Sequence, residues 1–166
     1  MIDPSFLRDF RQTIDLAAAK LLECSDEDAG RRPAPDKWSR KEILGHLIDS
    51  ASNNHGRFVR AQIQDDLVFP GYDQEAWVRL QRYQDRPWAD LVGLWQVYNH
   101  HIANVMETAE PAVVDRPRLR HNLNDLAWIP ADASQPVTLG YFMRDYVGHM
   151  KHHLKQALPQ RNLVGG

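Results

Sequence analysis

Apolar residues recur at helical spacing in four long stretches of the chain. In the first, from about Asp3 to Glu23, they follow one another at alternating steps of four and three, and charged residues occupy the other faces. This pattern is typical of an amphipathic helix with one buried face. The apolar positions of the first helix are Phe6, Phe10, Ile14, Ala17 and Leu21.

The second stretch has a well-defined start. Ser39 can cap the free backbone N–H groups, and Glu42, three residues on, can reach back to the cap, so the pair predicts a capping box. The helix should run to about Gln64. Its apolar face consists of Ile43, Leu44, Leu47, Ile48, Ala51 and Phe58. Along the edge of this face runs a polar flank, as expected of a helix that lines a buried site: His46, Ser50, Asn53 and Arg57.

Two further helices follow. Pro87 suits the first turn of the third, which extends to about Ala109. Its predicted buried residues are Leu91, Leu94, Trp95, Tyr98, Ile102 and Val105. Thr138 supplies the N-cap of the fourth, which runs to Ala157, and Pro159 and the Gly165-Gly166 end then close the chain.

Four amphipathic helices without alternating strand segments predict an all-α four-helix bundle, with residues 1–166 as a single domain. The connecting loops are long, at about 15, 22 and 28 residues, which exceeds what a minimal up-down-up-down bundle needs. At least one connection is therefore expected to cross over or to fold across a bundle end. The second also contains a short helical pattern around Trp77. Connections of this length often carry function.

Composition narrows the function classes. The 166 residues are 43% hydrophobic and have a formal net charge of −2, with both signs scattered along the chain, so no basic stripe indicates nucleic acid. No run of 18 apolar residues predicts a membrane span, and the N-terminal residues lack the features of a signal peptide. The lone Cys24 cannot form an intrachain disulfide, which fits a cytoplasmic protein. Its position beside an apolar helix face favours a packing role.

The fourth predicted helix carries the candidate chemistry. His149 and His153 are four residues apart, so both rings project from one helix face and can bind one divalent cation. His46 is the candidate third ligand, and three imidazoles would leave a coordination position open for water or substrate, as in catalytic sites. His152 is expected to face solvent. Met150 occupies the glutamate position of the zinc-peptidase motif HEXXH, which removes a peptidase's general base.

Spacing alone leaves two interpretations open: the histidines form a metal site, or they are a pair that arose by chance, as paired histidines on helices also do. Acceptors for the second imidazole N–H groups would be Asp49, Asp145 or Gln156, each within a turn of a candidate ligand. Arg57 and Arg60 can orient an anionic substrate group, or form part of a solvated charged face. The five tryptophans can line a pocket or fill the core.

Three sequence blocks in order resemble the DinB/YfiT-like metalloenzyme family, which includes bacillithiol- and mycothiol-dependent S-transferases. They are PAPDKWSRKEILGHLIDSASNNHGRF at 33–58, GYDQEAW at 71–77 and DYVGHMKHHLKQ at 145–156. The resemblance implies an antiparallel four-helix bundle, usually a homodimer, with a nickel or zinc ion on three histidines. The family's histidines fall on His46, His149 and His153.

The chemistry that the resemblance implies is transfer of a low-molecular-weight thiol, as co-substrate, to electrophilic small molecules. A bound divalent ion lowers the pKa of a thiol or water and so supplies the nucleophile at neutral pH. The thiol would not be Cys24. Alternatives are metal-dependent hydrolysis, and a non-catalytic stress-response bundle that binds a metal or ligand. A nucleic-acid module, suggested by the damage-inducible name of the family, fits the net charge poorly. No catalytic residue beyond the ligands is assigned.

Overall fold

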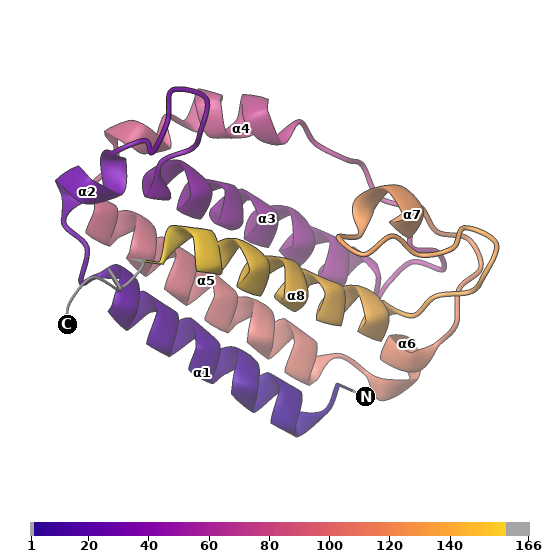
Figure 1. Cartoon of the computed structure of the whole chain (residues 1–166). Coiled ribbons are helices and arrows are strands. Elements are labelled where there is room, and N and C mark those ends of the chain that lie inside the picture. Colours follow the sequence, from indigo (N-terminus) through magenta and orange to yellow (C-terminus); the bar gives the residue numbers. More distant parts are fainter. Residues whose placement is uncertain (1, 159–166) are drawn as a thin grey trace, which may run out of the picture.

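A computed structural model describes residues 2–158 and contains the four predicted long helices (Figure 1). They are α1 (Pro4–Leu21), α3 (Arg40–Arg60), α5 (Trp88–Thr108) and α8 (Leu139–Ala157). Shorter helices lie in the connections: α2 (Asp26–Gly30), α4 (Gln74–Gln81), η1 (Tyr83–Asp85), α6 (Pro111–Asp115) and α7 (Leu123–Leu126). Within the described residues only isolated β-bridges occur, and no strands. Pro159 and the Gly165-Gly166 end lie outside the described residues.

Side chains at the helix starts confirm the predicted caps. The Ser39 hydroxyl accepts from the Glu42 backbone N–H at 3.2 Å, and the Glu42 carboxylate accepts from the Ser39 N–H at 2.9 Å, so the capping box is complete. Thr138 accepts from the Tyr141 N–H at 3.1 Å at the start of α8. The two helices that carry the candidate ligands therefore begin at residues that the sequence already marks.

The order of the helices around the bundle differs from their order in the chain. α5 packs against α1 and α3, and α8 packs against α3 and α1, so consecutive helices α1 and α3 lie diagonally opposite. Figure 1 shows that α3 and α5 run in one direction and α1 and α8 in the other. The connection at 61–87 must return along the whole bundle, and it carries α4 over α3. This is the predicted crossover, and it explains the length of that connection.

The core lies between the four helices and is built from the predicted apolar faces. Its largest fully buried side chains include Phe10, Phe58, Trp95 and Phe142. Tyr146 places a hydroxyl in this core and donates it to the Asn99 side chain at 2.6 Å, which satisfies both groups. The core therefore supplies a rigid frame on which α3 and α8 are held in contact.

Two sequence predictions about packing have different outcomes. Cys24 is half-buried and packs against the core, as expected. Leu94 was expected on the buried face of α5, but its side chain is 51% exposed. It lies about 100° around the helix from the fully buried Trp95, and so falls outside the face that α1 and α3 cover.

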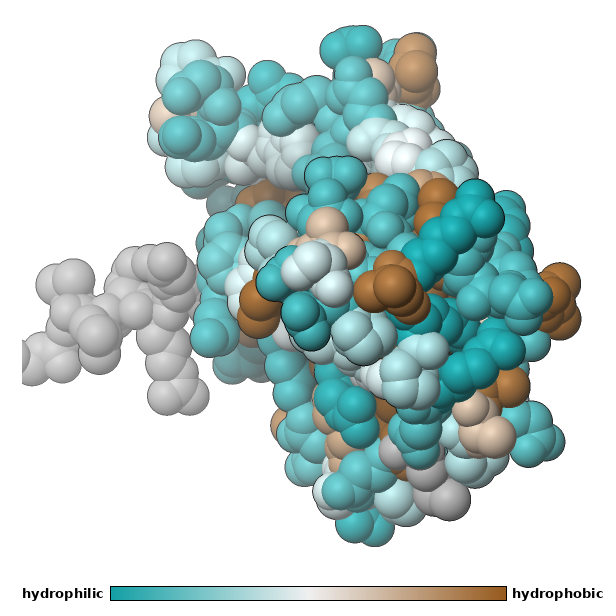
Figure 2. Space-filling view, turned by 90° about the vertical axis from the view of Figure 1, so that its right-hand side faces the viewer, coloured by the Kyte–Doolittle hydropathy of each residue, from teal (hydrophilic) through white to brown (hydrophobic). Residues whose placement is uncertain are grey.

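Figure 2 looks onto the bundle end where the connection between α5 and α8 lies, and hydrophilic residues dominate this face, with apolar residues in isolated spots. Within the described residues no helix combines the length and the apolar character that a bilayer crossing requires.

Candidate metal centre

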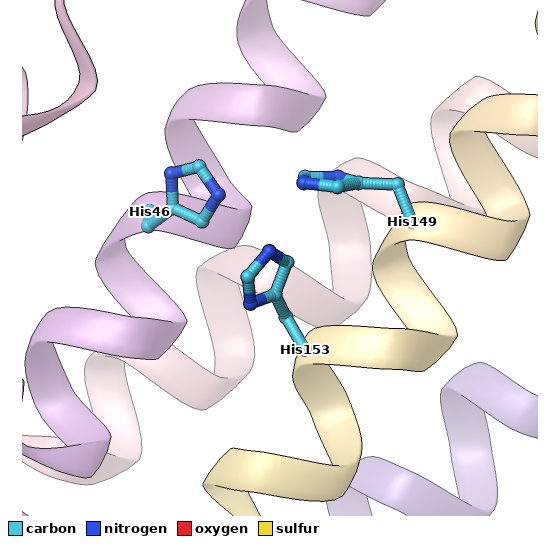
Figure 3. Close-up of side chains that lie close together, drawn as sticks. All are labelled: His46, His149 and His153. Carbon is cyan, nitrogen blue, oxygen red and sulfur yellow. The ribbon is translucent and has the colours of Figure 1, made fainter. Parts of the chain in front are cut away.

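Three histidines from two neighbouring helices converge on one point. His46 lies two turns into α3, and His149 and His153 are one turn apart on α8. Figure 3 shows the three rings turned toward one another in the space between the helices. One nitrogen from each ring can be chosen so that all three lie within 4.8 Å of one another. This geometry suits a single cation, because metal–imidazole bonds are about 2.0–2.1 Å long.

The burial of His46 without a hydrogen-bond partner among the described residues is what a metal ligand would show. His46 is 1% exposed, and neither of its ring nitrogens has a hydrogen-bond partner within the described part of the chain. A buried polar group without a partner costs free energy of about 1–3 kcal/mol, so such groups are rare in folded proteins. Here the unpartnered ring faces two other imidazoles, and a shared cation would satisfy it.

The surroundings keep the imidazoles neutral, which is the form that binds a metal. Burial, with a smaller repulsion from His153, lowers the pKa of His46 to about 4. Burial and the other histidines lower the pKa of His149 to about 3. Burial also lowers the pKa of His153, and the hydrogen bond that His153 donates to Gln156 Oε1 opposes this shift.

Of the three predicted acceptors for a second imidazole nitrogen, the structure brings Gln156 to a histidine. Its Oε1 lies 3.1 Å from His153 Nδ1. Asp49 instead accepts from Tyr83 Oη at 2.6 Å, and Asp145 accepts from the backbone N–H groups of two residues in the 127–129 segment at 2.8 Å. The predictions for Asp49 and Asp145 are therefore wrong. The hydrogen bonds of Asp49 hold the connection at 61–87 against α3, and those of Asp145 hold the connection at 109–138 against α8.

His152 is exposed, as predicted from its place on the helix wheel, and its ring lies 5.4 Å from that of Trp128. It therefore stays outside the group of three. Trp38 contacts the site from the other side, with its ring 5.4 Å from that of His46. Trp88 and Trp95 are core residues. Trp77 belongs to neither group: it is half-buried, with its ring 4.9 Å from that of Tyr72.

A cavity of about 310 Å³ adjoins the histidines and includes His149 in its wall. α3 and α8 form two walls, and the connections at 61–87 and 109–138 form the rest. Its principal lining residues are Ser50, Asn54, Arg57, Tyr72, Trp128 and Tyr146. The predicted polar flank of α3 does line a buried site, although Asn54 takes the place expected for Asn53. Asn53 instead donates to the Asp49 backbone carbonyl at 2.9 Å.

Sequence reasoning missed Tyr72 as a cavity residue. It lies in the connection before α4, inside the GYDQEAW block, and burial raises its pKa to about 12. Its hydroxyl therefore stays protonated at neutral pH and can donate a hydrogen bond. Arg57 is buried in the same wall, whereas Arg60 is exposed.

Comparison with known proteins agrees with this architecture. A family model described as the DinB superfamily matches residues 9–157. A solved structure of YfiT from Bacillus subtilis, described as a probable metal-dependent hydrolase with an unusual four-helix bundle topology, is similar with a TM-score of 0.70. The two share 19% sequence identity, over 95% of this chain and 86% of that one. At this identity the likeness supports the fold. No curated protein matches the chain.

Proposed function

Because this chain belongs to the DinB superfamily, we propose that its three histidines hold a divalent cation, nickel or zinc, in an enzyme that acts on small molecules. The proposed reaction joins a low-molecular-weight thiol to an electrophile. Unpartnered, buried ring nitrogens on His46, next to a cavity large enough for a small molecule, are the observation that carries the proposal.

The chain's own residues would prepare the site in three ways. Burial keeps His46 and His149 neutral, so their lone pairs are free to ligate. Gln156 can accept the Nδ1–H of His153 and thereby leave Nε2 as the ligating atom. Tyr72 offers a protonated hydroxyl to a bound substrate in the cavity. A divalent cation bound there lowers the pKa of a thiol or water and so supplies a nucleophile at neutral pH.

In the proposed transfer, the thiol sulfur forms a bond to an electrophilic carbon. The leaving group departs with the electron pair of its own bond to that carbon, and the thiol proton passes to solvent. The cavity walls orient the electrophile and exclude competing water.

A second candidate, metal-dependent hydrolysis, is supported by the description of YfiT as a probable metal-dependent hydrolase. The same three histidines would serve it, with water in place of the thiol. A non-catalytic bundle that binds a metal or ligand is the remaining alternative, and turnover separates it from both enzymes.

Metal analysis of protein purified without an affinity tag tests the ligands. We expect about one nickel or zinc ion per chain in the wild type, and at least a tenfold loss of metal affinity in His46→Ala and His149→Ala. His152→Ala is the matched control, because it removes an exposed imidazole from the same helix, and it should keep its metal. Stoichiometric metal in both ligand variants would refute the assignment.

Turnover assays separate the reactions. The metal-loaded protein is incubated with several biological thiols and a generic electrophile, with and without thiol. Faster thiol consumption than in His153→Ala supports transfer, whereas product formation that needs no thiol supports hydrolysis. No turnover under either condition would favour the non-catalytic alternative.

A further inference from the structure

Arg57 is a buried cation in the wall of the cavity beside the histidines. Its side chain is 5% exposed, and it shares the cavity lining with His149. Removing a guanidinium from water is costly unless other groups compensate its charge. What compensates Arg57 therefore bears on what the cavity binds.

The described hydrogen-bond and ring contacts of Arg57 are with neutral groups, and the nearby charge of Arg60 is also positive. Arg57 Nη1 donates to Asn54 Oδ1 at 3.4 Å and its Nη2 donates to the Pro70 carbonyl at 2.9 Å, while the Tyr72 ring lies 6.0 Å from the guanidinium carbon. In residues 2–158 no carboxylate lies within ion-pair distance of it. These contacts use two of the five N–H donors of an arginine and neutralise none of its charge.

Other buried cations of this protein have acidic neighbours. Lys41, also 5% exposed, pairs with Asp26 at 2.9 Å. Arg118 holds the carbonyl groups of Ala61 and Val113 under electrostatic attraction from Asp65 and Asp66, and it does not line this cavity. Arg57 thus differs in lacking an acidic partner and in facing a cavity.

The Arg57 side chain leans toward the histidines. Its bond to Asn54, three residues earlier, directs the guanidinium toward the N-terminal half of α3, where His46 lies. The two residues are eleven positions apart, or about 16 Å along the helix axis at ~1.5 Å per residue. A molecule that reaches from the histidines to Arg57 would contact both ends of the cavity.

We propose that Arg57 binds a carboxylate group of the substrate, at the end remote from the reacting atom. This inference rests on the proposed function and names the class of substrate. A planar carboxylate can accept two parallel hydrogen bonds from a guanidinium. A phosphate dianion fits less well, because Asp125 and Asp145 also line the cavity and would repel a second negative charge. Phe142 and Trp128 supply apolar surface for the rest of the molecule.

Binding of a matched pair of probes tests this proposal without requiring turnover. 4-Phenylbutanoate and its uncharged amide, 4-phenylbutanamide, differ in the group that would meet Arg57. Isothermal titration calorimetry should show that the acid binds the metal-loaded protein at least tenfold more tightly than the amide. The preference should vanish in Arg57→Gln and persist in Arg60→Gln, which removes an exposed arginine one turn away on the same helix.

Metal-free protein provides the second arm, since a carboxylate can also ligate a cation. We expect the preference for the acid to survive metal removal. A preference that disappears with the metal, or that persists in Arg57→Gln, overturns the proposal. Circular dichroism checks the fold of the variant. If Arg57→Gln does not fold, Arg57→Lys, which keeps the charge but not the planar fork, should show a reduced preference for the acid, and an unchanged preference there also overturns it.

The failure of this inference is distinguishable from failure of the proposed function. Metal binding and turnover with equal affinity for the two probes would refute the carboxylate site alone. An Arg57-dependent preference for the acid, in a protein that binds no metal and turns over no substrate, would refute the enzyme and leave the anion site.

Discussion

Burial determines the charge of the individual histidines at the site. The pKa of His46 is about 4, against an ordinary value of 6.5, because the side chain is removed from water and faces other imidazoles. At neutral pH the imidazole of His46 is mostly neutral in both the folded and the unfolded state, so its burial costs little free energy. At lower pH the unfolded chain takes up a proton at His46, and folding then requires the loss of that proton. The stability of the metal-free protein should therefore depend on pH in a predictable direction.

We predict that the free energy of unfolding of the metal-free protein decreases as the pH falls from about 6.5 to 4. In this range the unfolded state binds a proton at His46 and the folded state does not, so acid favours unfolding. The shift of His46 from 6.5 to about 4 corresponds to roughly 3 kcal/mol at ~1.4 kcal/mol per pKa unit. Urea unfolding at a series of pH values measures it.

The His46→Gln variant should show a weaker dependence on pH, because it lacks one of the three histidines whose pKa is lowered, while His149 and His153 remain. His152→Gln, which changes an exposed histidine on α8, should keep most of the dependence, because His152 makes only the smallest contribution to the lowered pKa of His149 and of His153. Equal slopes in the wild type and His46→Gln would contradict the origin assigned to the effect.

At the scale of the element, helix α3 makes a close contact with the connection that follows it, and this contact fixes its position. Gly45 precedes His46 and faces the Tyr83 ring, into which any Cβ at position 45 would project. Tyr83 in turn donates its hydroxyl to Asp49 at 2.6 Å, one turn further along α3. The helix surface beside the ligand is therefore shaped to receive an aromatic ring.

We predict that Gly45→Ala destabilises the protein by about 1–3 kcal/mol, since the added methyl must displace the Tyr83 ring. Gly93→Ala is the matched control. No atom lies within 4 Å of a Cβ built at that position in α5, so the substitution should stabilise by up to about 1 kcal/mol through helix propensity. Chemical denaturation compares the two. Equal effects of the same sign would show that helix propensity, and not the approach of Tyr83, determines the result.

At the scale of the whole molecule, the long connections close the cavity over the bundle. Arg57 holds the Pro70 carbonyl from α3, and Asp145 holds the backbone of Trp128 and Ile129 from α8. Side chains of the bundle thus fasten the two connections that complete the cavity wall. The homodimer expected from the family resemblance stays a prediction.

We predict that Asp145→Asn loosens the 127–129 segment, because an asparagine turned toward two N–H groups has one acceptor oxygen and a mismatched amino group. Limited proteolysis should cleave the connection between α5 and α8 several-fold faster, at an unfolding cost of about 1–3 kcal/mol. The metal content should not change. Loss of metal with an unaltered cleavage rate would instead indicate that Asp145 supports a ligand histidine.

The sequence predicts those parts of the site that lie close together along the chain better than those that lie far apart along it. The spacing of His149 and His153 places both on one face of a helix, because helical geometry is local. His46 lies about a hundred residues earlier, so spacing alone left its pairing with them as one of two interpretations, and the resemblance to a family then favoured it. Asp49 and Asp145 have the right spacing for helping the histidines, but the connections offer them tyrosine and backbone donors instead.

The sequence by itself determined the four helices, the caps at Ser39 and Thr138, and the polar flank of α3, since these follow from periodicity and from hydrogen bonds between residues close in the chain. Tertiary structure alone decided that α3 packs beside α8, that Tyr72 and Trp128 complete a cavity, and that Arg57 is buried with no acidic partner among residues 2–158. Those contacts join segments distant in sequence, and their energies depend on how the long connections fold back over the bundle.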